Sequence, residues 1–408
     1  MARGPGSRTI RAVSATGQWA KRALWTVGIV VAALSLASVS AYWWWFAAAR
    51  ERIVDVTYGR RGDVPLLLDV FRPHRANGAG IVVIVSGSWK SGRDAARPFI
   101  FAPFLRHGYA VFAVRHVSQP ECLIGDIAQD LHRAVRFIRH HSGDYGIDPG
   151  RIGVVGGSSG GHLALLLATR GGPGPEDAAD PVDRESSAVQ GAAVFFPATD
   201  LLNLGRSTEN AGDGGPPKSY RRGFGPRGET LAEWKVLGGD LSPIDHVTAD
   251  LPPVLIIHGD ADTLVPLDQS ERFAERARAV GREVRLEVRP GKKHGWPTMA
   301  LDVLRMADWF DEYLGRRASA RQPVVVVVED VLGRSPVLDR EARPGLGEWP
   351  EGRPGAAQVG RGFARQASTA RRIARMWSGV VPQQPPTMAT PRSSSSGTRA
   401  AIVSGVSS

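Results

Sequence analysis

The residues best suited to chemistry lie in the segment Gly-Gly-Ser-Ser-Gly-Gly at 156–161, which follows a short apolar run and precedes a helical pattern. A serine nucleophile needs such a turn, because its backbone is strained and its neighbours must lack side chains. The helix start that follows favours developing negative charge. Two registers of Gly-x-Ser-x-Gly fit, centred on Ser158 and on Ser159. Because the strand-like run ends by Gly156, we expect Ser158 to be the nucleophile.

A serine hydroxyl needs a base to accept its proton and an acid to orient that base. Asp262 and His294 each follow a short β-branched run further along the chain. Side chains that follow the strands of an open α/β sheet meet at the carboxyl ends of those strands. The order Ser158, Asp262, His294 therefore predicts a catalytic triad at one edge of a sheet. Asp260 is a competing candidate for the acid.

The region 51–315 alternates strand-like and helical patterns, as in the amphipathic stretch 124–141. This alternation predicts an α/β fold with a doubly wound, mostly parallel sheet and helices on both faces. The first two strands are expected to pair as a hairpin, and 203–240 to form a lid-like insertion. The expected strands are 53–58, 66–71, 81–86, 110–117, 152–155, 192–196, 254–258 and 284–288.

The chain here resembles the α/β-hydrolase superfamily, specifically its bacterial esterase/lipase branch with feruloyl-esterase-like and acetyl-esterase-like members. The likeness covers about 51–315 and rests on the segment 156–162, on H-G-x-x-D-x-x-V-P at 258–266 and on His294-Gly295. It implies an eight-stranded α/β-hydrolase fold and a serine hydrolase that cleaves small carboxylic esters through an acyl-enzyme intermediate. Ser158, Asp262 and His294 would then be the catalytic residues, with no cofactor and no metal.

The loop expected to hold the oxyanion departs from this family. The family usually has H-G-G-x-W after the third strand, whereas this chain has Val-Ser-Gly-Ser-Trp at 85–89. Backbone N–H groups form such a site, so Gly87, Ser88 and Ser159 are the expected donors. Losing one donor costs about a hundredfold in rate, so the change predicts modest or selective activity. His162 follows the serine turn, and we interpret it as structural.

The net charge of +11 resides in the ends of the chain. Residues 1–50 carry six Lys or Arg and no acid, 316–408 have a net charge of +8, and 51–315 have a net charge of −3. This distribution argues against a nucleic-acid partner for the folded part. The single cysteine, Cys122, excludes an internal disulfide.

The segment 23–49 contains 27 residues without a charge and follows a basic segment, 1–22. As a helix it is about 40 Å long, which exceeds the ~30 Å hydrocarbon layer. Aromatic residues at 42–46 suit the membrane interface. The pattern predicts a cytoplasmic 1–22, a single-pass signal anchor that binds the lipid membrane, and an extracytoplasmic catalytic domain. The alternative is a signal peptide cleaved near Ala41, which gives a secreted protein.

The segment 318–408 is rich in Arg, Pro, Gly and Ser and is expected to be a low-complexity, disordered tail. Two other functions are compatible with the same residues. One is a serine peptidase of the prolyl-oligopeptidase type, and the other is a non-catalytic α/β-hydrolase-fold binding protein at the membrane. The acyl and alcohol groups of the substrate do not follow from the sequence.

Overall fold

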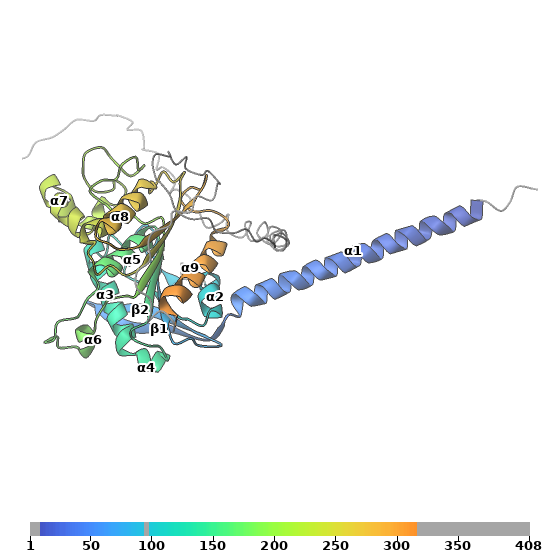
Figure 1. The fold of residues 1–408 in the computed structure, drawn as a ribbon, viewed down its shortest axis with the longest axis horizontal. Helices are drawn as coiled ribbons and strands as arrows, with labels where there is room; N and C mark the ends of the chain where they lie inside the picture. The colour runs from blue at the N-terminus through green and yellow to red at the C-terminus, as the bar shows by residue number, and fades with distance from the viewer. Residues whose placement is uncertain (1–8, 94–97, 316–408) are drawn as a thin grey trace, which may run out of the picture. The chain divides into compact units, whose positions relative to one another are not determined.

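The structure is a computed structural model that describes residues 9–93 and 98–315 (Figure 1). The predicted disordered tail, 318–408, lies outside the described residues, as does the start of the basic segment 1–22. The disordered tail therefore stays a prediction.

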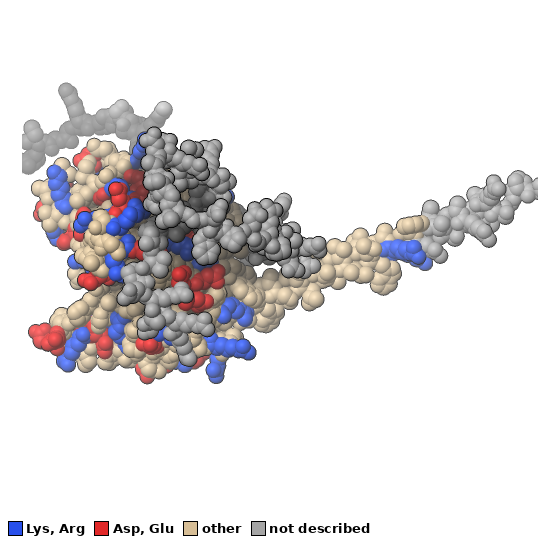
Figure 2. Space-filling model, in the orientation of Figure 1, with Lys and Arg blue, Asp and Glu red and all other residues tan. Residues whose placement is uncertain are grey.

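The first element is helix α1, Thr9–Phe46. Its segment Trp19–Trp45 has a mean hydropathy of 2.0 and is 27 residues long. Length and composition suit a membrane span and equally a signal sequence. Figure 2 shows a long part of this helix without Lys, Arg, Asp or Glu, with a blue patch of Lys and Arg toward its N-terminal end.

In the described part of the chain, eight strands form one sheet in the order β1-β2-β4-β3-β5-β6-β7-β8. The strand β1 pairs with β2 as an antiparallel hairpin, β2 is antiparallel to β4, and the remaining neighbours are parallel. This arrangement confirms the predicted mostly parallel, eight-stranded sheet. The strands are β1 Ala49–Arg61, β2 Val64–Pro73, β3 Gly80–Ile84, β4 Ala110–Val114, β5 Ile152–Gly157, β6 Gly191–Phe195, β7 Val254–Gly259 and β8 Val284–Arg289.

The central strands are buried on both faces, which explains their continuous apolar runs. Because successive side chains of a strand point to opposite faces, each strand contributes to two hydrophobic clusters. In β3, Val82 and Ile84 belong to one cluster, and Ile81 and Val83 belong to the other.

Helices cover both faces of the sheet (Figure 1). The apolar sides of α3, α5 and α8 pack into one cluster, and those of α2 and α9 pack into the other. The helices are α2 Pro98–Arg106, α3 Ile124–His140, α4 Ser142–Tyr145, α5 Ser159–Arg170, α6 Pro181–Arg184, α7 Leu231–Asp240, α8 Asp268–Ala279 and α9 Met299–Leu314. Short 3₁₀ helices are η2 Arg221–Phe224, η3 Pro226–Gly228 and η4 Pro243–His246.

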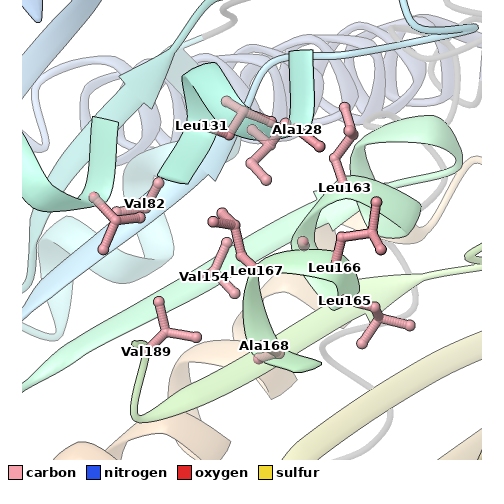
Figure 3. Packing of buried hydrophobic residues seen from close by; sticks show 14 of the residues in the cluster. Val82, Ala128, Leu131, Val154, Leu163, Leu165, Leu166, Leu167, Ala168 and Val189 are labelled. Atoms are coloured by element: carbon pink, nitrogen blue, oxygen red, sulfur yellow. The ribbon is translucent and has the colours of Figure 1, made fainter. Parts of the chain in front are cut away.

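Helix α5 follows the serine turn directly and is buried along most of its length. Leu163, Leu166 and Leu167 are each 1% exposed. Figure 3 shows Leu167 beside Val154 of β5, with Leu131 of α3 facing the same interior. This packing holds the start of α5 in place, and with it the end of β5.

The insertion 203–240 between β6 and β7 contains η2, η3 and all of α7. Its buried Phe224 packs edge-to-face on Trp234 of α7, with ring centroids 4.9 Å apart. The ring of Phe224 also lies 6.0 Å from Trp89, which follows β3. The insertion therefore rests on the loop that follows β3.

Because Leu167 is buried between α5 and the sheet, its truncation to alanine removes apolar contacts and leaves a cavity. We expect Leu167→Ala to lower the free energy of unfolding by about 2–5 kcal/mol. The measurement is urea unfolding of the full chain in detergent micelles, followed by tryptophan fluorescence. The matched control is Leu231→Ala, because Leu231 is 47% exposed and should change stability by less than about 0.5 kcal/mol. Equal losses in the two variants would contradict this packing.

Candidate active site

Ser158 stands in the sharp turn between β5 and α5. Its backbone angles are φ +55° and ψ −122°, a strained combination for a residue with a side chain. Its N–H donates to the carbonyl of Phe195 over 3.0 Å, and its carbonyl accepts the N–H of His162 over 2.9 Å. Gly156 is required because a Cβ there would lie 2.1 Å from the carbonyl oxygen of Gly160. Strand pairing, the first helical turn and this glycine together hold the strained turn.

His294 follows β8 and lies between Ser158 and Asp262. Its Nδ1 is 2.7 Å from Oδ2 of Asp262, and its Nε2 is 2.9 Å from Oγ of Ser158. A carboxylate can only accept a hydrogen bond, so Nδ1 carries the hydrogen. Nε2 is then free to accept the hydroxyl hydrogen of Ser158. The structure thus brings the three predicted residues into one hydrogen-bonded chain.

Asp262 is 4% exposed, yet its hydrogen-bond donors support the charged form of its carboxylate. Oδ1 accepts the N–H groups of Leu264 and Val265, over 2.9 and 3.0 Å. Nε2 of His258 lies 3.6 Å from Oδ2. Burial by itself raises the pKa of Asp262, but the nearby rings of His258 and His294 and the N–H of Val265 outweigh it and lower the pKa to about 2. The carboxylate therefore stays charged beside His294.

The loops after β7 and β8 approach each other closely, which sets the separation of Asp262 and His294. The N–H of Ala261 donates to the carbonyl of Lys292 over 2.9 Å. A Cβ at Gly259 would lie 2.2 Å from the same carbonyl oxygen, so only glycine permits the contact.

Phe196 supports the imidazole from the end of β6. Its ring centroid lies 4.3 Å from that of His294, and its backbone has φ +33°. Sequence reasoning missed this residue, because an apolar residue at a strand end carries no mark of chemistry.

The competing carboxylate, Asp260, is exposed and turned toward the chain after β8. Its Oδ1 accepts the N–H of Gly291 over 2.6 Å. Among the residues that the structure describes, the carboxylate bonded to His294 is that of Asp262.

In the loop after β3, the expected role of the Gly87 N–H as an oxyanion donor is corrected. Its N–H donates to the carbonyl of Lys90 over 3.0 Å, and the N–H of Lys90 donates back over 2.9 Å. This bridge occupies the group that we expected to face an oxyanion, so Gly87 is removed from the predicted donors. Within residues 9–93 and 98–315, the N–H groups of Ser88 and Ser159 have no assigned acceptor. The first belongs to the same loop and the second to the first turn of α5.

A cavity of about 50 Å³ lies beside Ser158. Its lining is mostly apolar, with Leu201, Leu264 and Val265 among the contributors. Tyr220 of the insertion also lines it, and its hydroxyl lies 3.1 Å from Oγ of Ser88. The insertion thus shapes the space next to Ser158, and Tyr220 is a residue that sequence reasoning did not identify.

His162 is fully buried and has two hydrogen-bond partners. Its Nε2 lies 2.7 Å from the carbonyl of Leu241, and its Nδ1 accepts the indole N–H of Trp89 over 3.1 Å. Burial lowers the pKa of His162 to about 4, against the opposing effect of the bond to Leu241. A neutral ring that joins the loop after β3 to α5 agrees with the structural interpretation.

In the described part of the chain no cluster of three or more His, Cys, Asp or Glu could hold a metal ion. The adjacent residues His140 and His141 contact Glu185 and Asp144 instead.

Comparison with known proteins extends these observations. The sequence model of the BD-FAE family matches residues 68–277. The chain is 29% identical to esterase LipQ of Mycobacterium tuberculosis over 284 residues, which is 66% of this chain and 64% of that protein. A truncated carbohydrate esterase from gut microbiota superposes with a TM-score of 0.57 at 26% identity, covering 66% of this chain and 98% of that one. Esterase 2 of Thermogutta terrifontis, phosphoramylated by tabun, has a TM-score of 0.52 at 26% identity, covering 65% and 96%.

The family model spans half of the sequence. The chain belongs to the BD-FAE family. Its sheet and the matching structures confirm the predicted α/β-hydrolase fold. In this BD-FAE protein the matched segment contains Ser158 and Asp262, whereas His294 lies beyond it. The chain spans less than two thirds of LipQ.

The lowered pKa of Asp262 predicts a specific pH dependence of stability. Its pKa in the folded state, about 2, is below the ordinary value of 3.8. The charged carboxylate therefore stabilises the fold above pH 4, and this contribution, about 2 kcal/mol, is lost as the pH falls toward 2. We expect the stability difference between wild type and Asp262→Asn, measured by urea unfolding, to shrink by about that amount between pH 6 and pH 2.

Asp260→Asn is the matched control, because Asp260 is exposed and its carboxylate accepts the N–H of Gly291 in place of a histidine. Its unfolding free energy should follow that of the wild type at every pH. If Asp262→Asn also ran parallel to the wild type, the hydrogen bonds assigned to Asp262 would be wrong.

Proposed function

We propose that this BD-FAE protein is a serine hydrolase that cleaves small carboxylic esters with Ser158, His294 and Asp262. The observation that carries the proposal is the pair of bonds made by His294, 2.9 Å to Ser158 and 2.7 Å to Asp262. The esterase names of LipQ and of the structural relatives support the same reaction class.

In the proposed mechanism Oγ of Ser158 attacks the ester carbonyl carbon while Nε2 of His294 takes the hydroxyl proton. Collapse of the tetrahedral intermediate breaks the carbon–oxygen bond, and His294 returns the proton to the departing alcohol. His294 then deprotonates a water molecule, whose oxygen attacks the acyl carbon. The acid is released and Ser158 regains its proton. Asp262 holds the imidazole in the required tautomer and stabilises the imidazolium.

The proposed oxyanion site consists of the N–H groups of Ser88 and Ser159. Both lie beside Ser158 in the lining of the same cavity. The start of α5 adds the positive end of a helix dipole behind Ser159. A cavity of about 50 Å³ with apolar walls suits a short acyl group.

Replacing the nucleophile tests the reaction. Ser158→Ala leaves no atom to attack the ester, so we expect hydrolysis of p-nitrophenyl acetate by the full chain to fall at least about 10³-fold. Ser142→Ala, a change at the start of the distant helix α4, is the control and should keep the wild-type rate. A wild type that cleaves a prolyl p-nitroanilide but not the ester would instead favour a peptidase. A wild type without either activity would favour a binding protein.

We propose further that 23–49 anchors the protein in a membrane with the catalytic domain, 51–315, on the extracytoplasmic side. The apolar span of α1 and the basic residues before it support this topology.

Membrane extraction tests the anchor. We expect the full chain to stay in the membrane pellet after alkaline carbonate washing and to keep its original N-terminus, because an apolar helix of this length is stable only in lipid. Protease added outside the cell should digest the catalytic domain. A soluble product that begins near Tyr42 would show instead that the segment is a cleaved signal peptide.

A further inference from the structure

The loop after β3 contains two strained residues next to the proposed oxyanion site. Ser88 and Trp89 have φ values of +55° and +54°, a region that residues with side chains adopt at a cost of about 1–2 kcal/mol each. Such a conformation persists only where surrounding contacts impose it. The sequence places Ser86 in this loop where the family resemblance leads one to expect glycine.

The side chain of Ser86 connects two elements that flank the loop. Its Oγ lies 3.2 Å from Oγ of Ser159 in α5 and 3.0 Å from Nε2 of His116, which follows β4. Oγ of Ser159 in turn accepts the backbone N–H of Trp89 over 2.9 Å. His116 is 6% exposed and Ser159 is 3% exposed, and Ser86 between them is half-buried.

The donor and the acceptor of each of these hydrogen bonds follow from the groups at the two ends of the chain, the carbonyl of Val117 and the N–H of Trp89. Nδ1 of His116 lies 2.8 Å from the carbonyl of Val117, which can only accept, so Nδ1 carries the hydrogen. Burial lowers the pKa of His116, which keeps the ring neutral near pH 7. Nε2 must then accept from Ser86. Because the hydroxyl hydrogen of Ser86 is used in this way, Ser86 accepts from Ser159, and Ser159 accepts from Trp89.

We propose that His116 and Ser86 are positioning residues that set the width of the oxyanion site through Ser159. This inference rests on the proposed function. The bond from Trp89 to Ser159 joins the neighbour of one proposed donor, Ser88, to the side chain of the other, Ser159. Its length therefore fixes how far apart the two N–H groups stand. This hydrogen-bond relay, which runs from His116 through Ser86 and Ser159 to Trp89, holds the strained loop.

The relay predicts a kinetic effect without a large binding effect. A shift of the donors by a fraction of an ångström weakens the contact with the oxyanion, which exists only in the transition state, and leaves the ester-binding cavity intact. For p-nitrophenyl acetate we expect His116→Leu and Ser86→Ala each to lower kcat about 10- to 100-fold, with KM changed less than threefold.

A variant that restores the hydrogen bond and a double variant distinguish a positioning role of His116 and Ser86 from a general effect on stability. His116→Gln offers an oxygen that can accept from Ser86, so it should recover most of the lost kcat. The double variant Ser86→Ala/His116→Leu should be no slower than the worse single variant, because each single change already breaks the same chain of hydrogen bonds. Thermal unfolding of each variant is measured in parallel.

The matched control is His132→Leu. Nδ1 of His132 lies 2.9 Å from Oγ of Ser187, and burial lowers the pKa of His132 to about 4, so a similar histidine–serine bond is removed away from the site. This variant should lose stability while its folded fraction keeps the wild-type kcat.

Labelling by a fluorophosphonate probe provides a second rate for the same comparison. The probe's phosphoryl oxygen uses the oxyanion site, so the labelling rate constant should fall in parallel with kcat. The inference is overturned if His116→Leu matches His132→Leu in kcat and labelling, or if the Gln variant does not recover. A wild type that neither labels nor hydrolyses esters would instead defeat the proposed function.

Discussion

The hydrogen bond between Ser158 and His294 joins residues 136 positions apart in the chain. It depends on the parallel strands from β3 to β8, whose carboxyl ends lie at one edge of the sheet. Ser158, the proposed nucleophile, follows β5. His294, its proposed base, follows β8, and Asp262, the proposed orienting acid, follows β7. A sheet with a reversed strand in this region would place one of the three at the opposite edge. The site is therefore a consequence of strand direction as much as of residue type.

Backbone strain concentrates at this same edge. Positive φ values occur at Ser158, at Ser88 and Trp89, and at Phe196. Each is held by well-packed surroundings: α5 and β6 at Ser158, the hydrogen-bond relay at Trp89, and the ring of His294 against Phe196. The buried core that Figure 3 shows beneath α5 supplies the rigidity that such conformations require. Stability of the core and geometry of the site are thus linked through α5.

The sequence predicts the sheet because strand-like runs alternate with helical patterns along the chain. Strands that are buried on both faces leave continuous apolar runs, which are easy to recognise. Their ends were less predictable. The run 110–117 was expected to be a strand, but β4 ends at Val114, where its pairing with β3 and β2 also ends. Strand ends depend on neighbouring strands, which a local pattern does not contain.

The candidate site likewise has features that a local sequence pattern predicts and features that depend on distant contacts. The glycines around Ser158 mark the turn in the sequence, because steric limits at a strained serine are local. The choice between Asp260 and Asp262 required the position of His294. The N–H of Gly87 is occupied by Lys90, a backbone contact that no residue type reveals.

Long-range contacts account for the residues that the sequence did not indicate. Tyr220 reaches the site from the insertion, 132 positions from Ser88. His116 contacts Ser86 across 30 positions. Neither residue belongs to a motif, and each acquires its role from the elements that surround it.

Mapping a covalent adduct at single-residue resolution tests the central claim most directly. The full-length chain is treated with paraoxon and digested with trypsin, and the peptide 152–170 is fragmented in a mass spectrometer. We predict one diethylphosphoryl group per chain, on Ser158. After the same short exposure, the Asp262→Asn variant should carry no adduct, because a His294 that no carboxylate orients activates the serine poorly. A stable adduct on Ser159 instead, or a wild-type chain without any adduct, would contradict the account.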